Sequence, residues 1–333
     1  MKLEQMPRYP LLCGFTPLQR MENLEQALGC GPLYIKRDDL TPLGLGGNKT
    51  RKLEFLLGDA LAGGADTLVT VGGVQTNHGR LTAAAAAKAG LACTLVLDGA
   101  QPEKLSGNLL LDCLLGASLV YTDGRSTSAV IEETLAALQA AGRAPYFIPE
   151  GGSNAVGSAG YLAMVPELLA QADSLPVPPA RLVCTMGSLG TFAGLWLGAR
   201  AFGAPFSVTG VAVNPTTGYT REKAAALVNE MSAAYGLDIA AAPQDMDIIY
   251  ADAAHDYAGP GYNVPDAKTR GAVELLARTE GIFLDPCYTA KSFRGFCDIA
   301  RALDGRAIFI HTGGTPALWT QEHLDAFAAD YWN

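Results

Sequence analysis

RLVCTMGSLGTFAG, residues 181–194, is the stretch that decides the fold. An apolar run that ends near Thr185 is followed by a turn of glycine and serine, and then by a helix start. Glycine lets the backbone approach an anion closely, and the amides of a helix start donate hydrogen bonds to it. Ser188 and Thr191 add hydroxyl groups to this turn. The stretch predicts a buried strand, a phosphate-binding turn and a helix. An ordinary strand-to-helix turn is the alternative that these residues leave open.

The same order of strand and helix recurs along the whole chain. Further runs rich in Val, Ile, Leu and Thr predict strands at 66–73, 92–99, 117–124, 145–152, 207–214 and 307–314. Most are continuous apolar runs, which is typical of strands buried on both faces. Helical patterns lie between them, for example at 53–61, 220–236 and 267–281. This alternation predicts an α/β fold with parallel sheets flanked by helices.

Composition narrows the class of function. The chain has 333 residues, 49% of them hydrophobic, which allows a large core and favours two domains. A net charge of -9 argues against a nucleic-acid partner. The seven cysteines contain no CxxC pair, which argues against a disulfide framework or a zinc site and favours a reducing cytoplasm. We expect neither a signal peptide nor a membrane partner, because no long apolar stretch is present.

Polar residues follow several of the predicted strands, where open parallel sheets bind their ligands. In GGVQTNHGR (72–80), Thr76, Asn77 and His78 stand beside helix-start amides, a combination that suits a carboxylate. A capping Thr or Asn with an incidental histidine is the alternative. HTGG (311–314) follows an apolar strand, and the loops GPGYNVP (259–265) and DPCYTAKSF (285–293) each hold one tyrosine. These residues can equally be packing or capping residues.

The stretch GGNKTRKLEF (46–55) places a lysine at a predicted helix start. Asn48 can cap this helix, so Lys49 is expected in its first turn. A cation there opposes the helix dipole, which favours the neutral amine when the side chain is partly buried. Schiff-base chemistry needs such a neutral amine. A solvated surface lysine is the alternative reading of the spacing.

Taken in order, these stretches resemble the D-cysteine desulfhydrase / 1-aminocyclopropane-1-carboxylate deaminase family from about residue 8 to residue 320. The segments that carry the resemblance include YIKRDDLTPLGLGGNKTRKLEFLLGDAL (34–61), QTNHGRLTAAAAAKAGL (75–91), GGSNAVGSAGY (151–161), GIFLDPCYTAKS (281–292) and IHTGGTPAL (310–318). The resemblance implies a pyridoxal 5'-phosphate (PLP) enzyme with the two-domain, tryptophan synthase β-like fold of type II. The proline-rich SLPVPPA (174–180) suggests a boundary within 152–180. The division we predict is a larger PLP-binding domain of residues 1–48 plus 162–333 and a smaller domain of residues 49–161.

The resemblance also assigns roles to residues. Lys49 matches the lysine that forms a Schiff base with PLP, and Gly187, Ser188, Leu189, Gly190 and Thr191 match the loop around the PLP phosphate. Asn77 matches the residue near the cofactor's 3-hydroxyl, and Thr312 the hydroxyl facing its pyridine nitrogen. Residues matching the substrate-binding and catalytic positions are Thr76, Asn77, His78, Tyr262, Tyr288 and Thr289.

The activity implied is an α,β-elimination. Threonine at positions 289 and 312 follows the desulfhydrase pattern, because the deaminases typically carry Glu and Leu there. We therefore expect a carbon-sulfur lyase that converts D-cysteine to pyruvate, hydrogen sulfide and ammonia, and a homodimer. The alternatives are an L-cysteate sulfo-lyase, a 1-aminocyclopropane-1-carboxylate deaminase and, outside enzymes, a small-molecule binding protein. Thr76 in place of the usual serine adds a methyl group beside the expected carboxylate site.

Overall fold

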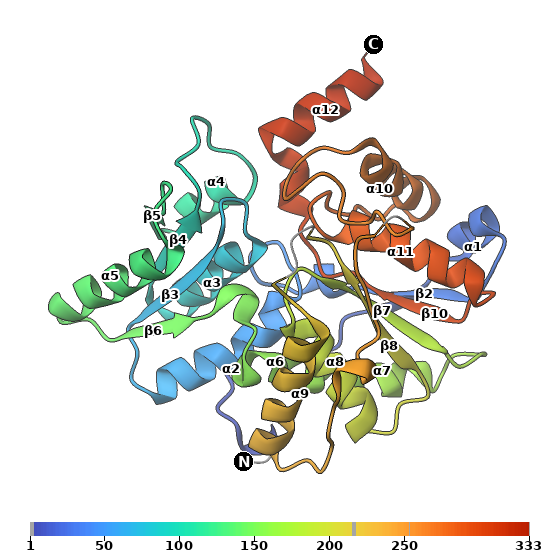
Figure 1. Ribbon diagram of the computed structural model, residues 1–333, viewed down its shortest axis with the longest axis horizontal. Helices are drawn as coiled ribbons and strands as arrows, with labels where there is room; N and C mark the ends of the chain where they lie inside the picture. The colour runs from blue at the N-terminus through green and yellow to red at the C-terminus, as the bar shows by residue number, and fades with distance from the viewer. Residues whose placement is uncertain (1–2, 215–217, 253, 333) are drawn as a thin grey trace.

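Two sheets form the framework of the molecule, one at each side of the view in Figure 1. The computed structural model describes residues 3–214, 218–252 and 254–332. The smaller sheet has four parallel strands in the order β5-β4-β3-β6. These strands are β3 (Thr67–Gly73), β4 (Ala92–Asp98), β5 (Ser118–Tyr121) and β6 (Pro145–Ile148).

The larger sheet has six strands in the order β1-β2-β10-β7-β8-β9. Its pairs are parallel except for β1 with β2. The strands predicted from the sequence are β7 (Arg181–Met186), β8 (Ser207–Ala212) and β10 (Ala307–Ile310). Three short strands were not predicted, namely β1 (Leu18–Arg20), β2 (Leu33–Lys36) and β9 (Ile248–Ile249). All seven predicted strands are therefore present, and the α/β fold class is confirmed.

Helices cover both faces of the larger sheet, which explains its continuous apolar strands. Along β7, Leu182 and Cys184 enter one core and Val183 enters the other. The first core includes residues of α6 (Ala155–Leu162), α7 (Met164–Ala172), α8 (Gly190–Ala201) and α9 (Arg221–Tyr235). The second includes residues of α1 (Glu22–Leu28), α10 (Ala267–Glu280) and α11 (Thr289–Ala302). Among the described residues, no helix is long and apolar enough to cross a membrane.

A third core lies around the smaller sheet, where Leu53, Leu68 and Leu95 are completely buried or nearly so. The helices that contribute to it include α2 (Lys49–Ala62), α3 (Asn77–Ala89) and α4 (Gly107–Leu114), while α5 (Thr127–Ala140) packs against β4 and β6 of the same sheet. Helix α6 packs against both α2 and α8 and so connects the two halves. The domain boundaries at 48/49 and 161/162 stay a prediction. A last helix, α12 (Gln321–Tyr331), lies at the top of Figure 1. The short 3-10 helices are Leu3–Gln5, Asp38–Leu40, Glu150–Gly152, Pro243–Asp245 and Thr315–Trp319.

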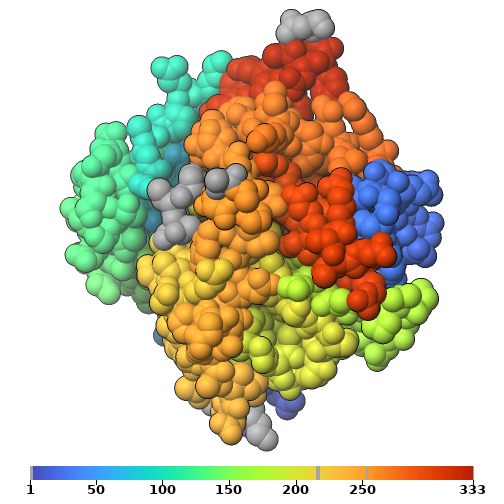
Figure 2. Space-filling view, turned by 45° about the vertical axis from the view of Figure 1, so that its right-hand side comes forward, coloured from blue at the N-terminus to red at the C-terminus, as the bar shows by residue number. Residues whose placement is uncertain are grey.

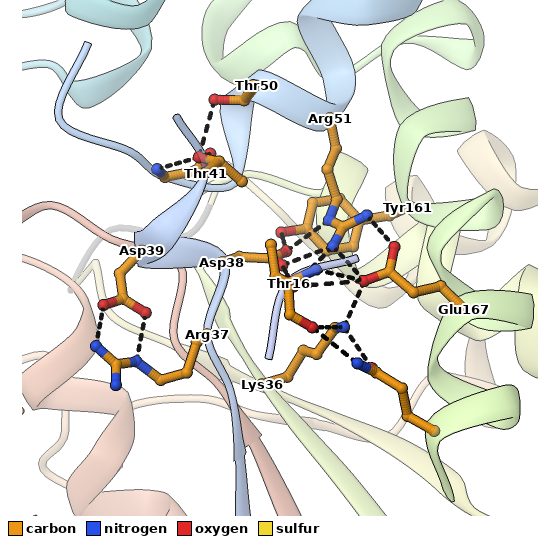
Figure 3. Close-up of polar contacts among 12 residues, drawn as sticks. Thr16, Lys36, Arg37, Asp38, Asp39, Thr41, Thr50, Arg51, Tyr161 and Glu167 are labelled. Carbon is orange, nitrogen blue, oxygen red and sulfur yellow. Dashed lines mark hydrogen bonds and ion pairs between the residues drawn. The ribbon is translucent and has the colours of Figure 1, made fainter. Parts of the chain in front are cut away.

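A buried ion network holds α2 against the larger half, as Figure 3 shows. The Arg51 guanidinium donates to both carboxylate oxygens of Asp38 at 2.9 Å and to Glu167 Oε2 at 2.8 Å. Lys36 also pairs with Glu167, and the Tyr161 hydroxyl donates to Asp38. Two cations thus face two carboxylates, and the cluster is electrically neutral. It fixes the helix that begins at Lys49.

Candidate active site

Lys49 is the first residue of α2 and lies in a pocket between the two halves. The prediction that Asn48 caps this helix with its side chain is wrong, because Asn48 has helical backbone angles and makes no side-chain cap. Its amide instead donates to Thr191 Oγ1 at 3.0 Å and accepts from Lys49 Nζ at 3.1 Å. Asn48 therefore links the lysine to the first turn of α8.

The environment of Lys49 favours its neutral amine. Burial lowers its pKa to about 8, although the carboxylates of Glu150 and Asp285 act in the opposite direction. The described side chains offer Lys49 no ion pair within 4.0 Å. An amine of this kind is a nucleophile and a base near neutral pH.

The turn that follows β7 forms a cup with a second lysine behind it. A Cβ atom placed on Gly190 would lie 2.7 Å from Lys52 Nζ and 2.7 Å from Ser158 Oγ, so a side chain here would displace these polar groups. Lys52 is fully buried, and its amine donates to the backbone oxygen of Gly151 at 2.9 Å. Ser153 Oγ accepts from the amide of Gly190 and donates to Ser188 Oγ, both at 3.0 Å.

This cup fits a phosphate group. Burial lowers the pKa of Lys52 well below its usual value, and the nearby charge of Lys49 lowers it further. The Ser158 hydroxyl is buried and has no partner among the described residues. An anion in the cup would restore the charge of Lys52 and accept from these donors. Sequence reasoning missed Lys52, although it lies three residues after Lys49 and thus on the same helix face.

The loop before α3 faces the cup from the smaller half. Thr76 is the N-cap of α3, and its Oγ1 accepts from the amide of Gly79 at 3.2 Å. The Thr76 methyl group packs against Gly79, because a Cβ atom there would lie only 2.5 Å from it. The extra methyl expected beside the carboxylate site is thus accommodated by Gly79. Asn77 completes the loop and also lines the pocket.

His78 is neutral and presents an acceptor. The Thr70 hydroxyl donates to the Ile148 oxygen at 2.8 Å, so it must accept from His78 Nε2 at 2.9 Å. Burial lowers the pKa of His78 well below its usual value, and Nδ1 therefore carries no proton. A carboxylate in this pocket would bind the helix-start amides of the loop rather than the His78 ring.

Tyr262 and Tyr288 approach each other at the opposite wall, with ring centroids 5.9 Å apart in an edge arrangement. Each ring lies against a glycine at a strand end. A Cβ atom on Gly73 would be 2.9 Å from Tyr262 Cε1, and one on Gly187 would be 2.7 Å from Tyr288 Cε1. Burial raises the pKa of both phenols, so both are protonated at neutral pH.

Thr289 is not brought to the pocket. Its hydroxyl donates to Asp285 Oδ1 at 2.6 Å, and Asp285 also accepts from the amides of Cys287, Tyr288 and Thr289. Burial raises the pKa of Asp285 despite these donors. Thr312 does line the pocket, and its backbone oxygen accepts from the amide of Asn48 at 3.0 Å.

Residues distant in the chain converge on this pocket, which has about 550 Å³ of empty space including its open mouth. The predicted residues that line it are Lys49, Thr76, Asn77, His78, Gly187, Ser188, Thr191, Tyr288 and Thr312. Leu189, Gly190, Tyr262 and Thr289 do not line it directly. Glu150 and Thr185 line it and were missed.

A neighbouring hollow extends from Tyr262. The residues that line it together with Tyr262 include Gln321 and Glu322 of α12 and, from the smaller half, Asp98, Pro102, Glu103, Lys104 and Ser106. Figure 2 shows the red α12 beside blue-green parts of the chain at the top of this face. The two halves thus meet on both sides of the tyrosine pair.

Comparison with known proteins gives the class that this fold and site define. The family model described as pyridoxal-phosphate dependent enzyme matches residues 10–313. The chain belongs to this family, and the cofactor prediction is confirmed. A fungal L-serine ammonia-lyase from Rhizomucor miehei, 19% identical with a TM-score of 0.64, shares the fold alone.

More similar proteins narrow the family. A D-cysteine desulfhydrase from Yersinia enterocolitica is 41% identical and matches 96% of this chain and 97% of its own length. A protein from Pyrococcus abyssi, provisionally named a 1-aminocyclopropane-1-carboxylate deaminase, is 39% identical. The match covers 95% of this chain and 94% of that protein. A crystal structure titled as an ACC deaminase homologue has a TM-score of 0.87 at 36% identity, covering 98% of this chain and 97% of its own. The resemblance seen in the sequence is therefore confirmed.

Proposed function

We propose that the chain is a carbon-sulfur lyase that converts D-cysteine and water to pyruvate, hydrogen sulfide and ammonia. The observation that carries the proposal is the Lys49 amine, whose pKa of about 8 suits a base in a pocket that is also lined by the protonated phenol of Tyr288. The similarity to D-cysteine desulfhydrases supports the same reaction.

The residues of the pocket fit PLP. Lys52, Ser158 and the turn from Gly187 to Thr191 would hold its phosphate, and Asn77 and Thr312 would contact its ring. When bound, PLP acts as an electron sink for the carbon chemistry. The fit rests on the unpartnered Ser158 hydroxyl and on the glycine cradle at position 190.

Different groups of the protein would bind the substrate carboxylate, remove the α-proton and assist the departure of sulfur. Helix-start amides of α3 and the Thr76 hydroxyl would bind the substrate carboxylate. Lys49 would remove the proton from the α-carbon. The hydroxyl of Tyr288, or of Tyr262 behind it, would donate a hydrogen bond to the sulfur as the carbon-sulfur bond breaks. The 2-aminoacrylate that leaves would hydrolyse to pyruvate and ammonia.

A substrate panel tests the proposal. The purified, PLP-loaded protein is mixed separately with D-cysteine, L-cysteine, D-serine, L-cysteate and aminocyclopropane carboxylate. Sulfide and pyruvate from D-cysteine are expected. Sulfite and pyruvate from L-cysteate would instead indicate a sulfo-lyase, and 2-oxobutyrate from the cyclopropane would indicate a deaminase. Either result without turnover of D-cysteine would overturn the proposal.

A further inference from the structure

A chain of hydrogen bonds reaches the pocket from the interior of the smaller half. Arg80 Nε donates to Asn108 Oδ1 at 2.7 Å, and Asn108 Nδ2 donates to Asn77 Oδ1 at 2.8 Å. Asn108 lies in the first turn of α4 and is fully buried. Its Nδ2 also donates to the backbone oxygen of Gln75 at 2.8 Å, so every polar atom of the amide is used.

Arg80 determines which atoms donate and which accept in this series of hydrogen bonds. A guanidinium can only donate, so the Asn108 atom that it contacts must be oxygen. The other end of the Asn108 amide is then the nitrogen, and the Asn77 atom that accepts from it must also be oxygen. Asn77 Nδ2 is left as a donor on the pocket side, 2.9 Å from where a Cβ atom of Gly314 would lie.

Arg80 is itself held firmly. It is fully buried, and its Nη2 donates to the backbone oxygen of Gly46, just before Lys49. Burial lowers its pKa to about 10, which leaves it charged at neutral pH. This series of hydrogen bonds therefore starts from a permanent donor, Arg80, and connects α4, α3 and the loop just before Lys49.

We propose that Asn108 is a positioning residue that keeps the Asn77 amide turned so that its N–H group faces the cofactor ring. This inference rests on the proposed placement of PLP beside Asn77. A donor at that point favours the ionised ring oxygen of PLP, whereas a flipped amide would present a repelling carbonyl oxygen. Asn108 would thus influence the cofactor without contacting it.

The experiment compares Asn108→Asp with the matched variant Gln75→Leu. The first has the same shape but loses the donor to Asn77, so the Asn77 amide is expected to turn its nitrogen toward the new carboxylate. The second removes the side-chain oxygen of Gln75 that accepts from the Asn108 backbone amide at 2.8 Å, but leaves the directional chain in place. PLP affinity of the apo-protein and the pH titration of the bound-cofactor absorbance are measured without substrate.

Asn108→Asp is expected to weaken PLP binding about tenfold and to move the midpoint of the absorbance titration by about one pH unit. Gln75→Leu should lower only the melting temperature. A wild-type titration in Asn108→Asp, or an equal shift in Gln75→Leu, would overturn the proposal. If Asn108→Asp does not fold, Asn108→Ala, which also removes the donor to Asn77, gives the same test. Because no substrate is used, the result is separate from whether the protein turns over D-cysteine.

Discussion

Helix α2 carries basic side chains of two kinds within a single turn. Arg51 is enclosed by the carboxylates of Asp38 and Glu167, as Figure 3 shows, and both ends of its guanidinium are paired. Lys49 and Lys52 have only amide and carbonyl partners. Burial by itself lowers the pKa of Arg51, but the two carboxylates more than offset this and raise it. For the two lysines, burial prevails and the pKa is lowered.

The difference distinguishes a basic group that stabilises the fold, Arg51, from basic groups that are available for a ligand, Lys49 and Lys52. A buried cation that is fully paired cannot accept a ligand without losing its own partners. A buried amine without a carboxylate is costly in the empty site, yet it is ready to bind an anion or to attack a carbonyl carbon. The following predictions test this contrast, from the largest expected effect to the smallest.

Replacing Lys49 should have the largest effect on turnover. Lys49→Ala removes both the nucleophile and the proposed base, so activity should fall at least about 10³-fold. The absorbance of covalently bound cofactor should disappear, while the circular dichroism spectrum stays that of the wild type. Retained turnover with the same products would show that another residue is the base.

Replacing Arg51 should instead affect the fold. Arg51→Met leaves Asp38 and Glu167 with only Lys36 as a cation, which should lower the free energy of unfolding by about 3–5 kcal/mol. Urea denaturation of the apo-protein measures this loss. An unchanged midpoint would mean that the network contributes specificity rather than stability.

Lys52→Met is the matched change on the pocket side of the same helix. The apo-protein should be as stable as the wild type or more so, because a buried amine without a carboxylate is removed. PLP affinity should fall about 10–100-fold, the loss expected for a hydrogen bond to a charged group. Tight PLP binding by this variant would contradict the assignment of Lys52 to the phosphate.

The lowered pKa of Lys49 predicts how fast apo-protein captures PLP. Below a pH of about 8 the amine is protonated and cannot attack, so the capture rate should fall about tenfold per pH unit. Above that pH the rate should level off. Glu150→Gln removes a charge that raises this pKa, so the midpoint should move to lower pH. Stopped-flow absorbance measures both curves, and a midpoint near that of an exposed lysine would contradict the lowered pKa.

The Thr76–Gly79 contact predicts a smaller effect on KM, which a second substitution should restore. Gly79→Ala places a Cβ atom 2.5 Å from the Thr76 methyl group, so the Thr76 side chain must turn. Its helix cap should be weakened by about 1 kcal/mol, and KM should rise about fivefold through the displaced hydroxyl. The double variant with Thr76→Ser should recover the KM, because the methyl is gone. Equal losses in both variants would show that Gly79 acts independently of Thr76.

Local patterns in the sequence were sufficient for much of the fold. The strands buried on both faces have continuous apolar runs, and the turn at 187–191 has glycines where side chains would collide with Lys52 and Tyr288. The short strands β1, β2 and β9 were missed because two to four residues are too few to show a period. Lys49 was singled out because its position at a helix start is a local property, and the resemblance to the family then assigned it the role of the Schiff-base lysine.

The partners of the site residues depended on the tertiary structure. Asn48 contacts Thr191 instead of capping α2, Lys52 meets Gly151 from 99 residues away, and Asn108 turns Asn77 from 31 residues away. Thr289 matches a substrate-binding position in the sequence, but its hydroxyl is bound by Asp285. Sequence periodicity shows which face of an element is buried, but it cannot show which distant segment covers that face. The sequence alone therefore determined the fold class and pointed to Lys49, and tertiary packing decided which polar groups are paired and which are left without a partner.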